Sequence, residues 1–155
     1  MRKWIVIAIA ALFIAAIIRL ILSTQTALDD DVQAYVSGLN YKFIARVDSA
    51  SVTNERKGVG FLYCKVISGS FNPAIEEQLA TKLKEHKRLR FAFPTGDSSF
   101  KVFLGGIKRF KSFDSVVVDS EKDRFEVYRG EESVWKSKIS NTTVHKVSFA
   151  FWLPD

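Results

Sequence analysis

Few residues of this chain have the type and spacing that catalysis requires. Its only thiol, Cys64, lies between Leu62 and Val66, and an apolar setting keeps a thiol protonated and unreactive. The two histidines, His86 and His145, are far apart and lack the spacing of a metal-binding motif. No stretch of this chain has the Gly-x-Ser-x-Gly form of a nucleophile elbow. We therefore predict no catalytic residue, no metal site and no cofactor, and we favour a binding protein over an enzyme.

Charged residues are distributed unevenly along the chain. Residues 82–111 contain nine basic and two acidic side chains, whereas residues 112–132 contain seven acidic and three basic ones. A basic surface attracts acidic partners over a distance of several ångströms. The alternative is that both stretches form ordinary solvated surfaces. The candidate binding residues are Lys84, Lys87, Arg88, Lys108, Arg109 and Lys111.

The N-terminal region contains an apolar run at residues 4–22. About 20 helical residues cross a bilayer core, so the run predicts a transmembrane helix. Basic residues 2–3 precede it and favour a cytoplasmic N-terminus. We expect residues 1–22 to be a single-pass signal anchor in the cell membrane, with the remainder extracytoplasmic, on the periplasmic side in a bacterium. A cleaved signal peptide is the alternative, although small residues are poorly placed for cleavage.

The remaining sequence, about 130 residues, is long enough for one domain with a hydrophobic core. Its 13 phenylalanines argue against disorder, and a single cysteine cannot form a disulfide within the chain. Residues 23–40 are predicted to be a juxtamembrane connector. Within it, apolar residues recur at helical spacing and predict a short helix: Val32, Tyr35, Val36 and Leu39.

Residues 41–155 have the alternating pattern of a β-rich domain. Residues 41–53 and 59–68 predict a hairpin, and the second strand is apolar on both faces, as a central strand would be. Asn72 and Pro73 begin a helix whose predicted buried residues are Ile75, Leu79 and Leu83. Further strands are expected at 89–93, 100–104, 113–118, 124–129, 133–139 and 144–153. The predicted fold class is α+β: an N-terminal transmembrane helix, then a mostly antiparallel, curled or barrel-like sheet with one packed helix.

Two segments carry a resemblance to a known group of proteins. Phe43–Gly69 reads as strand, polar turn and strand, and Phe113–Val118 continues through Phe125–Arg129 as a second hairpin that begins with Asp-Ser. Together they resemble small, single-anchor exported bacterial proteins that are rich in β-structure. The resemblance implies an exported β-domain and no particular activity.

The sequence thus predicts a membrane-anchored, extracytoplasmic interaction module. Its expected contacts are the membrane through residues 4–22 and a protein partner or an anionic envelope component, with no nucleic acid. One alternative is an envelope hydrolase whose site is assembled from scattered residues, with His145 or His86 beside a carboxylate and a hydroxyl. The other is a pilin-like subunit, since pilins also join an N-terminal apolar helix to a β-domain.

Overall fold

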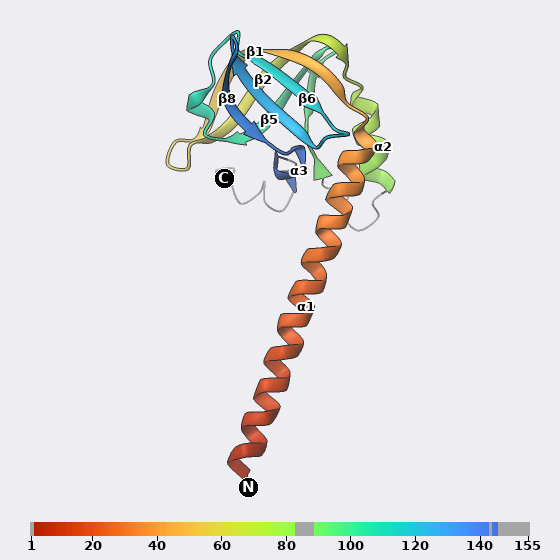
Figure 1. Ribbon diagram of the computed structural model, residues 1–155, viewed down its shortest axis with the longest axis vertical. Helices are drawn as coiled ribbons and strands as arrows, with labels where there is room; N and C mark the ends of the chain where they lie inside the picture. Colours follow the sequence, from red (N-terminus) through yellow and green to blue (C-terminus); the bar gives the residue numbers. More distant parts are fainter. Residues whose placement is uncertain (1, 83–88, 143, 146–155) are drawn as a thin grey trace. The chain divides into compact units, whose positions relative to one another are not determined.

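The computed structural model describes residues 2–82, 89–142 and 144–145. These residues belong to two compact units, residues 1–31 and 32–155 (Figure 1). The first unit is helical. The second contains every strand that the structure describes and the hydrophobic core.

A single helix, α1 (Arg2–Leu39), accounts for the first unit and continues into the second. It does not end after the apolar run but continues through the three aspartates at 29–31. Within the described residues, no helix is long and apolar enough to cross a membrane. The predicted transmembrane helix and single-pass signal anchor are therefore wrong, as is the predicted location in the cell membrane with a cytoplasmic N-terminus.

The last turns of α1 belong to the second unit and contribute to its core. Tyr35, Val36 and Leu39 are buried, and Val32 is partly buried against them. The apolar spacing that predicted a short helix therefore marks the buried end of a longer one. Asn40, with φ 50°, follows the helix and leads into the first strand.

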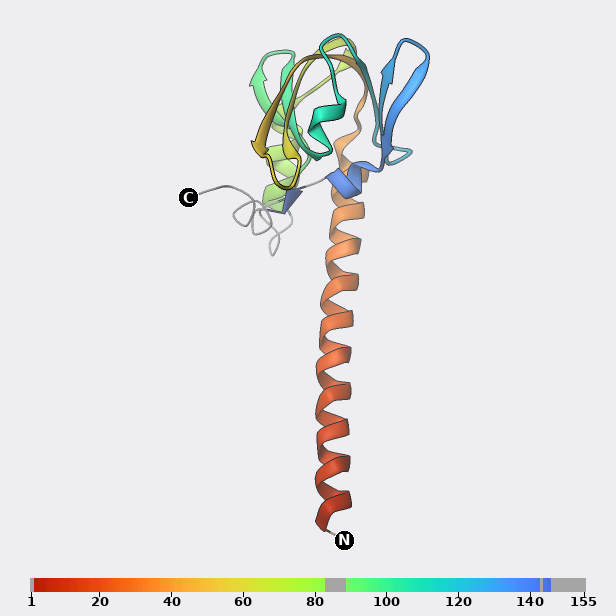
Figure 2. The same cartoon turned by 90° about the vertical axis from the view of Figure 1, so that its left-hand side faces the viewer.

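The second unit is a mostly antiparallel sheet with a few helices. Its seven strands pair in the order β4-β5-β2-β1-β6-β7-β8, so that β4 and β8 are the edges, and all neighbours are antiparallel. Figure 2 shows these strands curling around the interior. The strands are β1 (Lys42–Asn54), β2 (Val59–Ser70), β4 (Phe93–Gly96), β5 (Ser99–Gly105), β6 (Ser115–Asp119), β7 (Arg124–Arg129) and β8 (Glu132–Ser137).

Shorter elements connect or flank the sheet. Helix α2 (Pro73–Lys82) follows β2, and a 3₁₀ turn, η1 (Ile107–Arg109), follows β5. Helix α3 (Ile139–Thr142) follows β8. A separate two-stranded ladder joins β3 (Leu89–Arg90) to β9 (Val144–His145).

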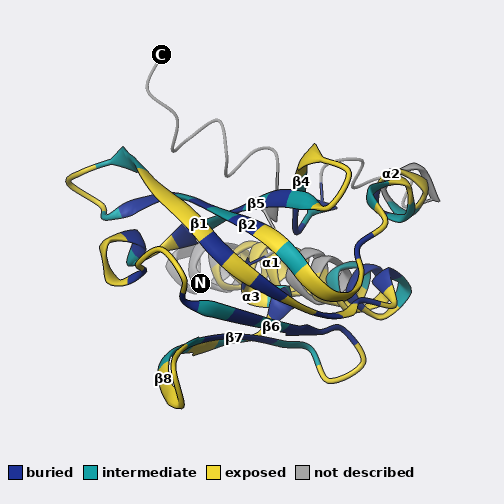
Figure 3. Cartoon of the chain, turned by 90° about the horizontal axis from the view of Figure 1, so that it is seen from above, coloured by how far each residue is buried: buried dark blue, intermediate teal, exposed yellow. Residues whose placement is uncertain are grey.

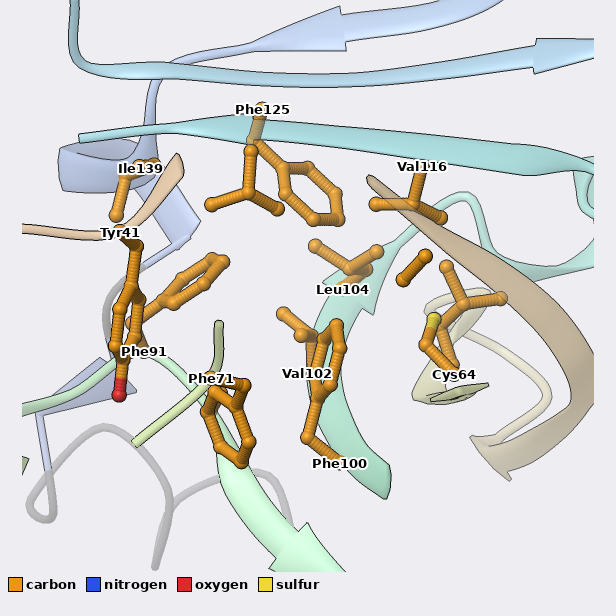
Figure 4. Packing of buried hydrophobic residues seen from close by; sticks show 14 of the residues in the cluster. Tyr41, Cys64, Phe71, Phe91, Phe100, Val102, Leu104, Val116, Phe125 and Ile139 are labelled. Carbon is orange, nitrogen blue, oxygen red and sulfur yellow. The ribbon is translucent and has the colours of Figure 1, made fainter. Parts of the chain in front are cut away.

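The core lies on the inner face of the curled sheet. Side chains along the first half of β1 alternate between buried and exposed, as the colours of Figure 3 show, because successive residues of a strand point to opposite faces. Aromatic rings fill much of the interior: Tyr41, Phe43, Phe71 and Phe100 pack with ring centroids 5.1 to 6.0 Å apart. Figure 4 shows Phe71 and Phe100 in this cluster and Cys64 further along the same interior.

The hairpin of residues 41–68 and the central position of its second strand were predicted, and both are confirmed, since β2 lies between β1 and β5. Asn72 caps α2 as predicted, accepting a hydrogen bond from the Ala74 N–H (3.1 Å). The predicted buried stripe of this helix is only partly correct. Ile75 and Leu79 are half-buried, while Glu76 is buried instead. Leu83 and most of the strand predicted at 144–153 lie outside the described residues.

The reactivity of Cys64 tests whether the core is packed as described. Its side chain is 1% exposed, and burial raises the pKa of the thiol. We expect a thiol reagent such as Ellman's reagent to leave the native protein unmodified and to react fully in denaturant. Cys64→Ser should lower the free energy of unfolding by roughly 1–3 kcal/mol, because the hydroxyl enters an apolar site. Rapid modification of the native protein would contradict the burial.

Candidate functional site

The loop after β5 displays three of the predicted binding residues. Ile107 is buried, and its N–H donates to the Gly58 carbonyl (3.1 Å) in the β1–β2 turn. Phe110 is also buried and packs edge-on against Trp135, with 5.8 Å between ring centroids. These two apolar anchors fix the backbone. The basic residues between and beside them are left exposed: Lys108, Arg109 and Lys111.

An ion pair between a buried carboxylate and an exposed arginine fastens the same loop to β7. Asp114 is 2% exposed, and Arg129 donates to both of its carboxylate oxygens from Nε and Nη2, each at 2.9 Å. Arg129 Nη2 also donates to the Arg109 carbonyl (3.1 Å), and the Lys111 N–H donates to Asp114 (2.9 Å). Paired hydrogen bonds of this kind are directional as well as strong. These contacts hold the loop against β7.

Phe113 is the most unusual residue of this loop. Its φ is 74°, in the left-handed region that bulky residues rarely adopt. The conformation is held by two hydrogen bonds to β1, from the Phe113 N–H to the Val47 carbonyl and from the Val47 N–H to the Asp114 carbonyl, each 2.8 Å. The ring is 76% exposed, and the Arg46 guanidinium lies 5.4 Å from its centroid. A strained backbone that presents an apolar ring to solvent is a feature often found at functional sites.

We call the residues Arg46, Lys108, Arg109, Lys111 and Phe113 the basic loop surface. Two of its cations have acidic neighbours: Lys108 pairs with Glu55, and Arg46 lies 4.0 Å from Asp48. Arg109 and Lys111 form no ion pair within the described part of the chain. These residues therefore keep a net positive charge, and one of them, Arg46, lies over the exposed ring of Phe113.

The other predicted site residues do not join this surface in what the structure describes. Lys84, Lys87, Arg88 and His86 lie outside the described residues. His145 is in β9, opposite Leu89. The residues that the structure describes contain no group of His, Cys, Asp or Glu side chains suited to a metal ion.

Known protein families, curated proteins and solved structures yield no match to this chain. The resemblance to small exported bacterial proteins therefore stays a prediction.

A second polar cluster surrounds the carboxyl group of Glu76, which is 2% exposed. The Tyr35 hydroxyl donates to Oε2 (3.0 Å), and the Tyr41 hydroxyl lies 3.3 Å from Oε1. The Ala92 N–H reaches both oxygens (3.2 and 3.3 Å), and the Phe91 N–H donates to the Tyr35 hydroxyl (3.0 Å). The carboxyl thus joins α2 to the end of α1, the start of β1 and the segment between β3 and β4. The buried carboxyl therefore links these elements and contributes to the stability of the fold.

Burial raises the pKa of Glu76 to about 7, because the ionised carboxylate loses its hydration. Hydrogen bonds from Tyr35, Ala92 and Tyr41 and the charge of Arg90 oppose this effect without cancelling it. Sequence reasoning missed the cluster because Glu76 lies in the first turn of α2, where an acidic residue is already favoured by the helix dipole. The sequence did contain a signal that Glu76 is buried. Glu76 precedes Leu79 by three residues and so shares a helix face with a residue predicted to be buried.

The raised pKa makes stability depend on pH. The folded state binds this proton more tightly than the unfolded state, so the contribution of Glu76 is complete below its ordinary pKa of about 4.5. It declines as pH rises to about 7, by about 3 kcal/mol in the free energy of unfolding. Glu76→Gln, which stays neutral, should remove this part of the slope in urea titrations at several pH values. The exposed Glu121→Gln is the control, and equal slopes in both variants would contradict the assignment.

Proposed function

We propose that the protein is a binding module that holds an acidic protein partner through the basic loop surface. The observation that carries the proposal is Phe113, an exposed ring in a left-handed backbone conformation beside Arg46. Aromatic residues and arginine are the residue types that dominate binding energy at protein interfaces. The proposal retains the interaction module expected from the sequence, without a membrane anchor.

The basic loop surface would contribute to binding in two ways, through long-range charge and through short-range apolar contact. Lys108, Arg109 and Lys111 would draw an acidic partner toward the loop, since complementary charge accelerates encounter. The ring of Phe113 would then lose its contact with water against an apolar patch of the partner. The loop is already fixed by Asp114 and Arg129, so little ordering is required on binding.

The hydrolase alternative has less support. It requires a histidine beside a carboxylate and a hydroxyl in a concave site. A described depression on the sheet is lined by Asp119 and Ser68 but not by His145, and His86 lies outside the described residues. Nothing comparable to the exposed ring of Phe113 favours a catalytic role for His145.

The basic residues are tested with the full-length protein and a fluorescent polyglutamate peptide, followed by anisotropy. Binding should weaken as salt shortens the Debye length from ~10 Å at 0.1 M to ~3 Å at 1 M. The triple variant Lys108→Gln, Lys111→Gln and Arg109→Gln should bind about tenfold more weakly, with little change in stability because exposed charges contribute little to folding.

A matched triple variant controls for net charge. Lys122→Gln, Lys136→Gln and Lys138→Gln removes the same charge from exposed positions elsewhere. It should bind as the native protein does. An equal loss of affinity in both triple variants would show that only the net charge of the protein matters. That result would contradict binding at a defined surface. Tighter binding of a single-stranded DNA of equal charge would overturn the assignment of an acidic protein as partner.

The variant Phe113→Gly tests whether the ring contributes to binding independently of its effect on stability. Glycine adopts positive φ without steric cost, so the free energy of unfolding should stay equal or rise by up to about 1 kcal/mol. This variant is tested with a second fluorescent peptide that contains leucine among its glutamates. Polyglutamate alone has only short apolar side-chain segments that could contact the ring. The variant should bind the leucine-containing peptide several-fold more weakly, because the ring is gone. Unchanged affinity together with raised stability would show that Phe113 is strained for no binding purpose.

A further inference from the structure

Two exposed glutamates lie next to the basic loop surface. Arg129 donates from Nη2 to the Arg109 carbonyl (3.1 Å), which brings the end of β7 against the loop. Arg129 is opposite Glu132 in the β7–β8 ladder, and Glu131 lies in the turn between these strands. Both glutamates are exposed. We call Glu131 and Glu132 the acidic turn.

One guanidinium group positions both the loop and the acidic turn. Arg129 is held by two hydrogen bonds to the carboxylate of Asp114, each 2.9 Å long. Only Gly130 and Glu131 separate it from its ladder partner Glu132, and Gly130 has the positive φ (61°) of a tight turn. The fold therefore fixes a positive and a negative cluster side by side.

The charges of these two clusters do not pair with each other within one chain. Arg109 and Lys111 form no ion pair in the described part of the chain, and neither do Glu131 and Glu132. Two cations thus lie beside two anions, all of them exposed. A partner that presents the two signs in the opposite order would complement both clusters at once.

A second copy of the chain, turned by a two-fold rotation, presents this opposite order. In a two-fold interface the same patch is used by both copies, so that a contact from one copy to the other always occurs twice. The basic loop surface of each copy would meet the acidic turn of the other. A uniformly acidic partner would complement the basic residues but would be repelled by the acidic turn, and this difference favours a second copy.

Phe113 provides an apolar contact for such an interface. It directly precedes Asp114, whose carboxylate holds Arg129, so the ring belongs to the same end of the sheet. The ring is 76% exposed. Two such rings, one from each copy, would lose contact with water against each other inside a border of charged residues, which is the usual arrangement of a protein interface.

We propose that the partner of the basic loop surface is a second copy of this chain, bound through a two-fold interface in which each basic loop surface meets the acidic turn of the other copy. This inference rests on the proposed function, because it names the partner of the same surface. The acidic partner is then the acidic turn of an identical chain.

Sedimentation equilibrium of the full-length protein tests the association. At 0.1 M salt the protein should exist as monomer and dimer, with a dissociation constant of order micromolar. The dimer should dissociate at 1 M salt, where the Debye length falls to ~3 Å, and on addition of polyglutamate, which competes for the loop. A monomer at a concentration about a hundredfold above that value would overturn the inference.

Charge reversal tests the orientation of the two copies. One variant carries Arg109→Glu and Lys111→Glu, and the other carries Glu131→Lys and Glu132→Lys. Each alone should dimerise at least about tenfold more weakly, because like charges then face each other. An equimolar mixture should form a heterodimer close to native affinity, since one copy has two acidic clusters and the other has two basic ones. Absence of the heterodimer would overturn the two-fold interface.

A matched variant controls for net charge. Lys122→Glu and Lys138→Glu reverses two charges at exposed positions elsewhere and should dimerise as the native protein does. Equal weakening in this control, or dimers of native affinity in all variants, would overturn the inference. A monomeric protein that still binds polyglutamate through the basic loop surface would contradict the second copy and leave the proposed function intact. A monomeric protein that does not bind the peptide would contradict both.

Discussion

The buried carboxyl group of Glu76 is the contact on which the arrangement of the second unit depends. It accepts hydrogen bonds from Tyr35 and from the Ala92 N–H, and the Tyr41 hydroxyl lies within reach. Through these partners it joins two helices, the first strand and the segment that leads to an edge strand. Removing it would leave buried hydroxyl and N–H groups unpaired, which costs more than each hydrogen bond contributes when present. The aromatic cluster of Tyr41, Phe43 and Phe71 packs beside it and depends on the same alignment.

The basic loop surface is held by contacts other than those of Glu76. The basic loop surface is held by its own ion pair, Asp114 with Arg129. The exposed residues Lys108, Arg109 and Lys111 could therefore change in sequence without altering the core. This separation is common in domains in which a rigid sheet carries functional loops.

Local patterns predicted the strands well and the contacts between distant segments poorly. Residues 124–129 alternate with period two and form β7 as expected. The helix at 32–39 was also predicted from its spacing, but its continuity with the preceding residues was not, because residues 1–22 and 23–40 were assigned to an anchor and a separate connector. The apolar run at residues 4–22 was interpreted as a membrane segment from its length, its apolar composition and the basic residues before it.

The candidate sites show the same limit. The charge count identified Lys108, Arg109 and Lys111, which are close in sequence and share one loop. It could not place Glu131 and Glu132 beside this loop, since only the contacts of Arg129 bring them together. It also could not assign a left-handed conformation to Phe113, because aromatic residues seldom adopt one and the two hydrogen bonds that hold it come from β1.

The edges of the sheet have a consequence for assembly. An edge strand exposes unpaired N–H and C=O groups that another chain can extend. Here β4 is short and contains Pro94, which has no N–H to donate, while β8 carries exposed charges at Glu132 and Lys136. Both edges therefore resist growth by strand addition. Recognition of this domain by another chain must use side chains on its faces and loops, and not an extension of its backbone ladder.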